Sequence, residues 1–498
     1  MSVIKGKHNL RFGVDIYHMG LNEAQAEFLG FAYGAQGGFN FDRGVTLRCE
    51  QAAPGGGCNQ VSDDSRGNSF AAFMLGQPTV ASRTLQVPDV YHIGVYLMGL
   101  YARDRWNITP KLTLDYGVRW EYFPTPTRND RGIEFYDATT NKVQLCGVGS
   151  VPDNCGATVS KKLFAPRLGI AYRPWNTWVI RAGYGITIDP YEGLEFVRAN
   201  HPILIALTSQ TPNSLFPVSP LSQGVPPVTA PDPGNGIIDI PGSVGFTGYP
   251  KKFQRGYIQS WNFTIQKELP WGFAGQVGYV ATHSTRQLAP IDLNAGQIIG
   301  AGAEGKPLFV QWGRDAQTLE LRPIGTGHFD SLQAQLQRRF TAGLAFTASY
   351  TWGKSINVTD NSSYQLAVNA QKYLDLNRSV TGFDRTHNFA LTSVWELPFG
   401  KGKHWMSSGG VGSAVLGGWQ VNTILSLISG PPFSVGADDT SLNMPGNTQR
   451  ADQVGPVTKL GGIGLDRLTP TIHNLLSLAS TSLASGTVAL TFSVLRAS

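Results

Sequence analysis

Four cysteines are the residues whose spacing most directly suggests chemistry in this 498-residue chain. They form two local pairs, Cys49 with Cys58 and Cys146 with Cys155, and each pair brackets a short segment rich in Gly, Pro, Asp or Asn. Neither pair is a CxxC motif and no histidine flanks them at zinc spacing, so no metal site is expected. The spacing predicts two loop disulfides in an oxidising compartment; the alternative is four free thiols in a reducing one.

Two other motifs resemble catalytic ones but lack necessary parts. WGKS (352–355) is similar to the end of a Walker A loop, yet Ala348 stands where that motif requires glycine, and the segment has a strand pattern. Asp384 and His387 in FDRTH have no nucleophile in a Gly-x-Ser-x-Gly or comparable cysteine context, and the histidines form no HExxH motif. We therefore expect no catalytic residue, cofactor or metal, and interpret the protein as not an enzyme.

The clearest structural element is TPKLTLDYGVRWEYFPTP (109–126). Apolar side chains occupy every second position from 112 to 120, and the positions between and after them include Asp115, Arg119 and Glu121. Alternation at period two predicts a β-strand with one apolar and one polar face. About 12 segments share this pattern, the second only weakly: 9–19, 37–46, 92–107, 111–123, 164–173, 178–188, 257–268, 273–283, 328–340, 343–354, 386–397 and 416–429.

Composition points to an unusual environment for these strands. Only 15% of the residues are charged, against roughly 25% in soluble globular proteins, while 11% are aromatic. The mean hydropathy is nevertheless slightly negative, at −0.12. This combination is typical of β-proteins with one face in lipid and one in water. Alternation alone fits a soluble β-sandwich equally well.

Connection lengths favour the membrane interpretation. Short links at 108–111, 173–177, 269–272 and 341–343 alternate with long Pro/Gly/Asn/Ser-rich segments at about 124–163, 189–256, 285–327 and 355–384. In an up-and-down barrel, this alternation places short periplasmic turns at one rim and long extracellular loops at the other. We predict an all-β, antiparallel transmembrane β-barrel, of which this chain is an incomplete part.

Aromatic residues mark both ends of the predicted strands. Trp106, Trp175, Trp178 and Trp271 lie at short turns, whereas Trp120, Tyr122 and Trp352 precede long loops. Such clusters predict two girdles at the membrane interfaces. Asp115, Arg119 and Glu121 would then line a wet lumen, because an arginine facing hydrocarbon near the midplane costs about 2–4 kcal/mol. Asp384 and His387 are expected in a polar cluster in the lumen or on the periplasmic side.

The remaining signals are negative. No stretch approaches the ~18 apolar residues of a transmembrane helix, and the first residues have no signal-peptide pattern. The net charge of +6 is scattered without Lys/Arg-rich runs, so nucleic-acid binding is not expected. Residues 10–18 already alternate like a strand, and we therefore expect the chain to begin inside a longer protein.

Several segments together resemble the barrel of TonB-dependent outer-membrane receptors, especially the Oar-like group with a carboxypeptidase-regulatory-like module. They span most of residues 4–455: IKGKHNLRFGVDI (4–16), LYARDRWNITPKLTLDYGVRWEYF (100–123), FAPRLGIAYRPW (164–175), SWNFTIQKEL (260–269), FDSLQAQLQRRFTAGLAFTASYTWGKSI (329–356), FDRTHNFALTSVWELPFGKGK (383–403) and GGWQVNTILSLISGPPFSV (417–435). The block around 104–121 and the pair ASYTWGKS and WELPFGKGK are specific as a set.

The resemblance implies a barrel of about 22 strands with a plugged lumen, opened by energy from the inner-membrane TonB complex to import a large substrate. Residues 1–455 would form the C-terminal part of that barrel, with the plug and TonB box encoded upstream. Residues 471–498 contain no Asp or Glu and a single aromatic residue, Phe492, unlike the aromatic-ended strand expected there. We predict that 456–498 is an aberrant tail produced by a frameshift.

Two other functions stay open from the sequence. One is an outer-membrane barrel for adhesion or for secretion of a partner, and the other is a soluble β-protein that binds glycans. The expected partners are outer-membrane lipid, the TonB complex and an unidentified extracellular substrate. An upstream plug and TonB box would favour import, whereas detergent-free solubility would favour the soluble protein.

Overall fold

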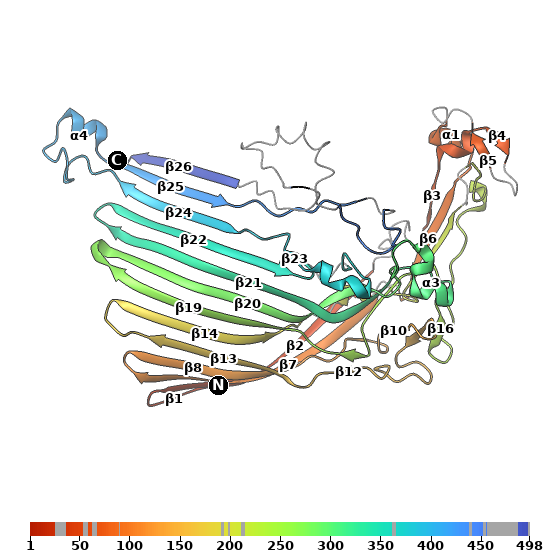
Figure 1. Cartoon of the computed structure of the whole chain (residues 1–498), viewed down its shortest axis with the longest axis horizontal. Helices are drawn as coiled ribbons and strands as arrows, with labels where there is room; N and C mark the ends of the chain where they lie inside the picture. The colour runs from red at the N-terminus through yellow and green to blue at the C-terminus, as the bar shows by residue number, and fades with distance from the viewer. Residues whose placement is uncertain are drawn as a thin grey trace.

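The computed structural model describes residues 1–24, 36–52, 58–61, 67–88, 90–190, 194–197, 200–210, 215–360, 365–437, 441–451, 455 and 487–496. Most strands belong to one large, mainly antiparallel sheet whose neighbours follow chain order (Figure 1). No helix in these ranges is long and apolar enough to cross a membrane.

The main sheet runs from β1 at one edge to β26 at the other, and in the described part of the chain these edges do not pair with each other. Its path is β1 (Ser2–Lys5), β2 (His8–Glu23), β7 (Tyr91–Thr109), β8 (Leu112–Tyr122), β13 (Leu163–Tyr172), β14 (Trp178–Ile188), β19 (Tyr257–Leu269), β20 (Phe273–Asp292), β21 (Thr318–Thr341), β22 (Leu344–Asn357), β24 (His387–Glu396), β25 (Trp419–Ile428) and β26 (Thr487–Arg496). Three short strands join its sides, β9 (Thr127–Arg128), β17 (Phe246–Gly248) and β23 (Ser379–Val380).

The pairing register aligns the strands so that the sheet has two chemically distinct faces. Directly opposite residues share a face, so Val118 lies level with Ala102 and Pro166, and Arg119 with Tyr101 and Ala165. We name the first side the apolar face and the second the polar face. Large side chains of the apolar face are solvent-exposed in the isolated chain: Phe12, Val14, Ile16, Leu100, Val118, Leu168, Phe263, Val277, Leu332, Leu336, Tyr350 and Leu427.

Tight connections gather at one end of the sheet, the turn end. The link between β21 and β22 consists of Ala342 (φ +50°) and Gly343 (φ +79°), and positive φ at both positions matches the right-handed twist of a two-residue hairpin. The link between β24 and β25 is an exception to the predicted short turns, because it spans 397–418 and contains helix α4 (Val411–Leu416).

Long connections gather at the opposite end, the loop end, and form smaller structures there. These are β10 (Glu134–Asp137), β11 (Lys142–Leu145) and β16 (Ile237–Asp239) in one sheet, and β12 (Thr158–Val159) paired with β18 (Lys252–Phe253). Short helices there are α2 (Leu194–Val197), α3 (Pro307–Trp312), η4 (Leu221–Gln223), η6 (Gly302–Gly305) and η7 (Gln371–Asn377); η5 (Pro270–Gly272) lies at a turn.

A slender arm projects from the loop end, in orange at the upper right of Figure 1. It contains the sheet β15–β6–β3, built from β3 (Gly38–Asn40), β6 (Val80–Gln86) and β15 (Leu204–Gln210), and near it η2 (Arg43–Thr46), α1 (Ser69–Met74), β4 (Cys49–Ala52) and β5 (Cys58–Val61). The predicted strand at 37–46 is therefore wrong as a barrel strand. Only Gly38–Asn40 is extended, and Asp42 then caps η2 through the backbone N–H of Gly44.

The buried core lies at the loop end, on the same side of β7 as the polar face. Tyr91, Ile93, Val95 and Leu97 occupy alternate positions there and are all buried. They pack with residues of the loops and neighbouring strands, including Ile133, Phe135, Phe253, Leu163 and Ala165. Each such side chain contributes about 1.5–3 kcal/mol by leaving water, so the loops form a packed cap.

Candidate functional site

The polar face of β2, β7 and β8 carries the residues predicted to line a lumen. Arg119 forms ion pairs with Asp15 of β2 and, at 2.8 Å, with Glu121 two positions along its own strand. Gly99 lies between these residues on β7, and a Cβ at that position would overlap the Arg119 guanidinium. Because residue 99 has no side chain, the Arg119 guanidinium can extend from β8 across β7 to reach Asp15 of β2.

Asp115, the third predicted residue, pairs with a different arginine. Its carboxylate accepts a 2.6 Å hydrogen bond from Nε of Arg103 and a second one from Nη2. Such two-pronged contacts fix the arginine plane and are stronger than single ones. The three predicted residues lie on one face, but they belong to two separate ion-pair groups.

Two more arginines share this face without any side-chain hydrogen bond or ion pair in the described part of the chain. They are Arg11, directly opposite Arg103, and Arg167, opposite Gly117. Together with Arg103 and Arg119 they line a cavity of about 390 Å³. Sequence alternation identifies Arg11 and Arg167 as polar-face positions, but only the register brings them to the same cavity.

The polar face changes character along the sheet. From β19 to β25 it carries mainly uncharged groups, among them Asn262, Gln276, Gln335, Ser349 and Thr392. Arginines and carboxylates are concentrated instead on β2, β7, β8, β13 and β14: Arg11, Asp15, Arg103, Arg105, Asp115, Arg119, Glu121, Arg167 and Arg181. The candidate site is therefore this charged sector, in which arginines outnumber carboxylates.

The predicted interface aromatics lie at the two ends of the sheet. Trp106, Trp175, Trp178 and Trp271 lie at the turn end, where Trp175 and Trp178 contact edge to face and Trp106 stacks on His8. Trp120, Tyr122 and Trp352 lie at the loop end on the apolar face, with the rings of Trp120 and Tyr122 stacked at 6.3 Å. Trp395 and Trp405 join the turn-end group without having been predicted.

Carboxylates such as Asp104 and Asp330 break the alternation. Asp104 lies on the apolar face, opposite Leu10 and Tyr116, but it is buried. Its Oδ2 accepts a 2.6 Å hydrogen bond from His8 Nδ1 and a 3.0 Å bond from the Tyr116 hydroxyl. The neighbouring side chains thus shield a charge that would be costly on a face bordering hydrocarbon.

The cysteines and FDRTH lie outside the charged sector. Cys146 and Cys155 are joined by a disulfide inside the loop cap. Cys49 is disulfide-bonded, while the side chain of Cys58 lies outside the described residues. The predicted lumenal or periplasmic cluster of Asp384 and His387 is wrong, because FDRTH lies at the loop end and His387 is opposite Trp352 on the apolar face.

Asp384 and His387 also have separate partners. Asp384 accepts hydrogen bonds from the Ser355 backbone and the Thr386 hydroxyl, whereas His387 Nδ1 contacts the Tyr350 hydroxyl at 2.8 Å. No group of three or more potential metal ligands occurs among the described residues.

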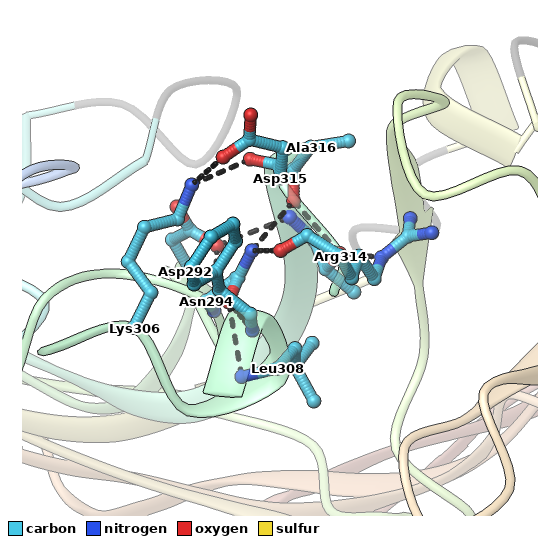
Figure 2. A network of polar contacts seen from close by, with 9 residues as sticks. Asp292, Asn294, Lys306, Leu308, Arg314, Asp315 and Ala316 are labelled. Atoms are coloured by element: carbon cyan, nitrogen blue, oxygen red, sulfur yellow. Dashed lines mark hydrogen bonds and ion pairs between the residues drawn. The ribbon is translucent and has the colours of Figure 1, made fainter. Parts of the chain in front are cut away.

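A polar network joins several segments of the loop end (Figure 2). Asn294 donates to the carbonyls of Arg314 (2.8 Å) and Ala316 (3.1 Å), and its Oδ1 accepts from the backbone of Leu308 and so caps α3. Lys306 binds Asp315 through Oδ1 at 2.9 Å. These bonds satisfy buried backbone groups that would otherwise lose water without compensation.

Arg314 is the centre of this network. Its side chain is 0% exposed, donates to the carbonyls of Pro241 and Val244 and to Thr318 Oγ1, and lies 5.1 Å from the Tyr136 ring centre. Burial lowers the pKa of this guanidinium below its usual range. The network joins the loop-end parts of β20 and β21 to residues 241–244 of the cap.

Comparison with protein families agrees with this two-faced sheet. The model of the outer membrane beta barrel domain matches residues 1–483. No curated protein matches the chain.

Similar solved structures include the outer membrane transporter YddB from Escherichia coli, at 10% identity over 91% of this chain and 45% of that one, with a TM-score of 0.45. Others are the FrpB iron transporter from Neisseria meningitidis (10% identity, 89% and 44%, TM-score 0.41) and the ferripyoverdine receptor of Pseudomonas aeruginosa (12% identity, 86% and 37%, TM-score 0.38). This chain spans less than half the length of each of these proteins.

The family match extends over nearly the whole chain and includes every strand of the main sheet from β1 to β25. It also excludes the soluble glycan-binding alternative, because the family is a membrane one. The protein is located in the outer membrane, and the chain belongs to the outer membrane beta barrel domain family.

Proposed function

We propose that this chain forms part of the wall of an outer-membrane transporter that imports a large substrate, with its apolar face against lipid and its polar face along the substrate pathway. The observation that carries the proposal is the charged sector, where a water-filled interior would hydrate or pair the many charged side chains concentrated on the polar face. Long loops at the loop end would make the first contact with the substrate.

The charges of this sector indicate the substrate class. Arg11 and Arg167 are not neutralised by a carboxylate in the described part of the chain, and they border the same 390 Å³ cavity as Arg103 and Arg119. A lumen with low-dielectric walls focuses such a positive potential. We therefore propose that the pathway favours anionic substrates.

TonB dependence and the Oar-like subgroup rest on the sequence resemblance. We propose that a plug and a TonB box are encoded upstream of the given sequence, and that an altered reading frame produced residues 456–498. Both are checked by translating the genomic DNA upstream of residue 1 and, beyond residue 455, in the other two frames. Residues 456–486 lie outside the described part, and β26 pairs with β25 along Trp419–Ile428.

Uptake of two size-matched oligosaccharides by intact cells tests import. Cells expressing the full-length gene would be offered a fluorescent neutral maltodextrin and a fluorescent anionic oligogalacturonide of the same length. We expect periplasmic accumulation of the anionic probe to exceed that of the neutral one. The excess should disappear when the gene is deleted or the TonB complex is inactive.

Charge reversal provides the matched variants. Arg11→Glu with Arg167→Glu should lower anionic uptake several-fold, because each removes a cation from the pathway and adds an anion. Lys5→Glu with Lys401→Glu, exposed residues at the turn end, has the same change in net charge and should leave uptake unaltered. Equal uptake of both probes in cells with and without the gene would contradict the proposal.

The arm favours a second candidate function, attachment to another surface or protein. Helix α1 exposes Phe70, Phe73 and Met74, and Leu75 follows them, at the tip of this projection. An exposed apolar cluster of this kind is typical of contact sites. Deletion of 69–75 that abolished cell attachment but not uptake would separate adhesion from import.

A further inference from the structure

The main sheet opens between β13 and β14 at the loop end. β13 pairs with β8 from Leu163 onward, but its pairing with β14 begins only at Arg167 opposite Gly185. β14 meanwhile continues with β19 to Ile188. Pro166, adjacent to the last pair, has no N–H to donate to a ladder. Residues 163–166 and 186–188 therefore form the two sides of a wedge, which the β12–β18 pair borders.

This wedge holds a cavity of about 630 Å³. Its apolar lining includes Phe164, which is 56% exposed, together with Ile186 and Tyr257. Phe164 is directly opposite Trp120 on the apolar face, so the Phe164 side of the cavity borders the membrane beside the loop-end aromatic residues. Aromatic rings of that kind lie at headgroup level in barrels, which places the cavity at the outer-leaflet interface.

Cations from separate parts of the chain converge on the same cavity. Lys162 precedes β13, Lys252 begins β18 and Arg286 lies at the bulge of β20. No ion pair or side-chain hydrogen bond of these three groups occurs in the described part of the chain, and no Asp or Glu lines the cavity. A fourth cation, Arg255, is 4% exposed and stacked 4.5 Å from the Phe253 ring centre at the same site.

We propose that this wedge binds a phosphate-bearing lipid of the outer leaflet whose head group has a net negative charge. Lys162, Lys252 and Arg286 would contact the phosphate, because charge-assisted hydrogen bonds to phosphate are the strongest that such side chains make. Phe164, Ile186 and the exposed Leu168 below them would contact an acyl chain. The apolar lining and the exposure of Phe164 on the apolar face favour a lipid over a soluble anion. The proposal depends on the outer-membrane location and not on import.

Native mass spectrometry of the full-length protein in detergent tests this site. The protein would be mixed with diphosphoryl lipid A, with phosphatidylcholine, or with inorganic phosphate followed by lipid A. We expect lipid A to be retained at least about tenfold better than phosphatidylcholine, which corresponds to about 1.4 kcal/mol. Millimolar phosphate should not displace it, because phosphate lacks the acyl contacts.

Charge reversal again provides matched variants. Lys162→Glu/Lys252→Glu/Arg286→Glu should lose lipid A retention about tenfold, whereas Lys5→Glu/Arg339→Glu/Lys401→Glu, with the same net charge change at the turn end, should keep it. Heat-modifiable gel migration would establish that both variants are folded, and Phe164→Ser provides a second variant that should weaken retention without changing charge. Retention equal to the unaltered protein in the triple charge variant, or displacement by phosphate alone, would overturn the proposal.

Discussion

Apolar residues alternate with other residues along both halves of strand β7, but the apolar side chains of the two halves lie on opposite faces of the sheet. From Leu100 toward the turn end, apolar side chains face outward, and Leu100 is 49% exposed. From Leu97 toward the loop end, apolar side chains face the other way, and Leu97 is 6% exposed beneath the cap. The two parts of β7 therefore have different surroundings. In the membrane-spanning part, the apolar face of the strand meets lipid and the polar face meets water. At the loop end, the polar-face side of the strand packs against the protein core of the cap.

The strongest expected effect comes from a charge placed in the cap. Leu97→Asp would put an unpaired carboxylate in a buried apolar cluster, at a cost of about 3–5 kcal/mol. Tyr101→Asp is the matched control, because it lies on the same face of β7 four residues further into the membrane-spanning part, near Arg119. Hydrogen exchange of the full-length protein should show the cap opened by the first change only. Equal exchange in both variants would contradict the assignment of two solvents.

A charge placed on the lipid side should have the next largest effect. Leu336→Arg puts a guanidinium on the apolar face of β21, which costs about 2–4 kcal/mol near the bilayer midplane. Gln335→Arg, one residue away on the polar face, should cost little since it meets water. The urea midpoint for unfolding from bilayers measures both. Similar midpoints would mean that the apolar face does not meet acyl chains.

Removing the bridging arginine should have a smaller effect. Arg119→Leu leaves the carboxylates of Asp15 and Glu121 without their cation, and lost charged hydrogen bonds cost about 1.5–3 kcal/mol. Arg105→Leu is the control, because this exposed arginine on the same face has no ion pair within the described residues. Urea unfolding at neutral pH compares the two. Arg119 would be no structural bridge if the midpoints fell equally.

The smallest effect is a pH dependence confined to the cap. Burial lowers the pKa of His201 below its usual 6.5, assisted by the charge of Arg314. A group with a lowered folded pKa stabilises the fold above 6.5, and this stability is lost as the pH falls through the folded value. Hydrogen exchange of Leu204–Gln210, corrected for intrinsic rates, should accelerate as the pH is lowered from about 7.5 to about 5, since the usual value of 6.5 lies between them.

Two histidine variants test this assignment. His201→Gln should flatten the pH dependence because it removes the titrating ring. His404→Gln changes an exposed histidine at the turn end and should leave the dependence as it was. If the acceleration persisted in His201→Gln, another group would be responsible.

Several strands that period-two alternation predicts agree closely with the strands of the structure. The prediction of 178–188 matches β14, and 111–123 differs from β8 by one residue at each end. The prediction of an aberrant tail overlooked β26, although Val488, Leu490, Phe492 and Val494 alternate with small residues there, and alternation misplaced 37–46. Alternation also ended the strand of 273–283 too early and began the strand of 328–340 too late. The loop-end parts of β20 and β21 pair with each other inside the cap, where one face no longer meets lipid and the alternation weakens.

The sequence by itself determined which side chains share a face and that the two faces need different solvents, because strand geometry alone fixes the period. It also placed Asp115, Arg119 and Glu121 together. Only the tertiary structure decided that Arg119 reaches Asp15 of β2, that Asp104 is shielded by His8, and that Lys162, Lys252 and Arg286 meet at one wedge. These are contacts between residues far apart in the chain, and register and loop packing, not local periodicity, bring such residues together.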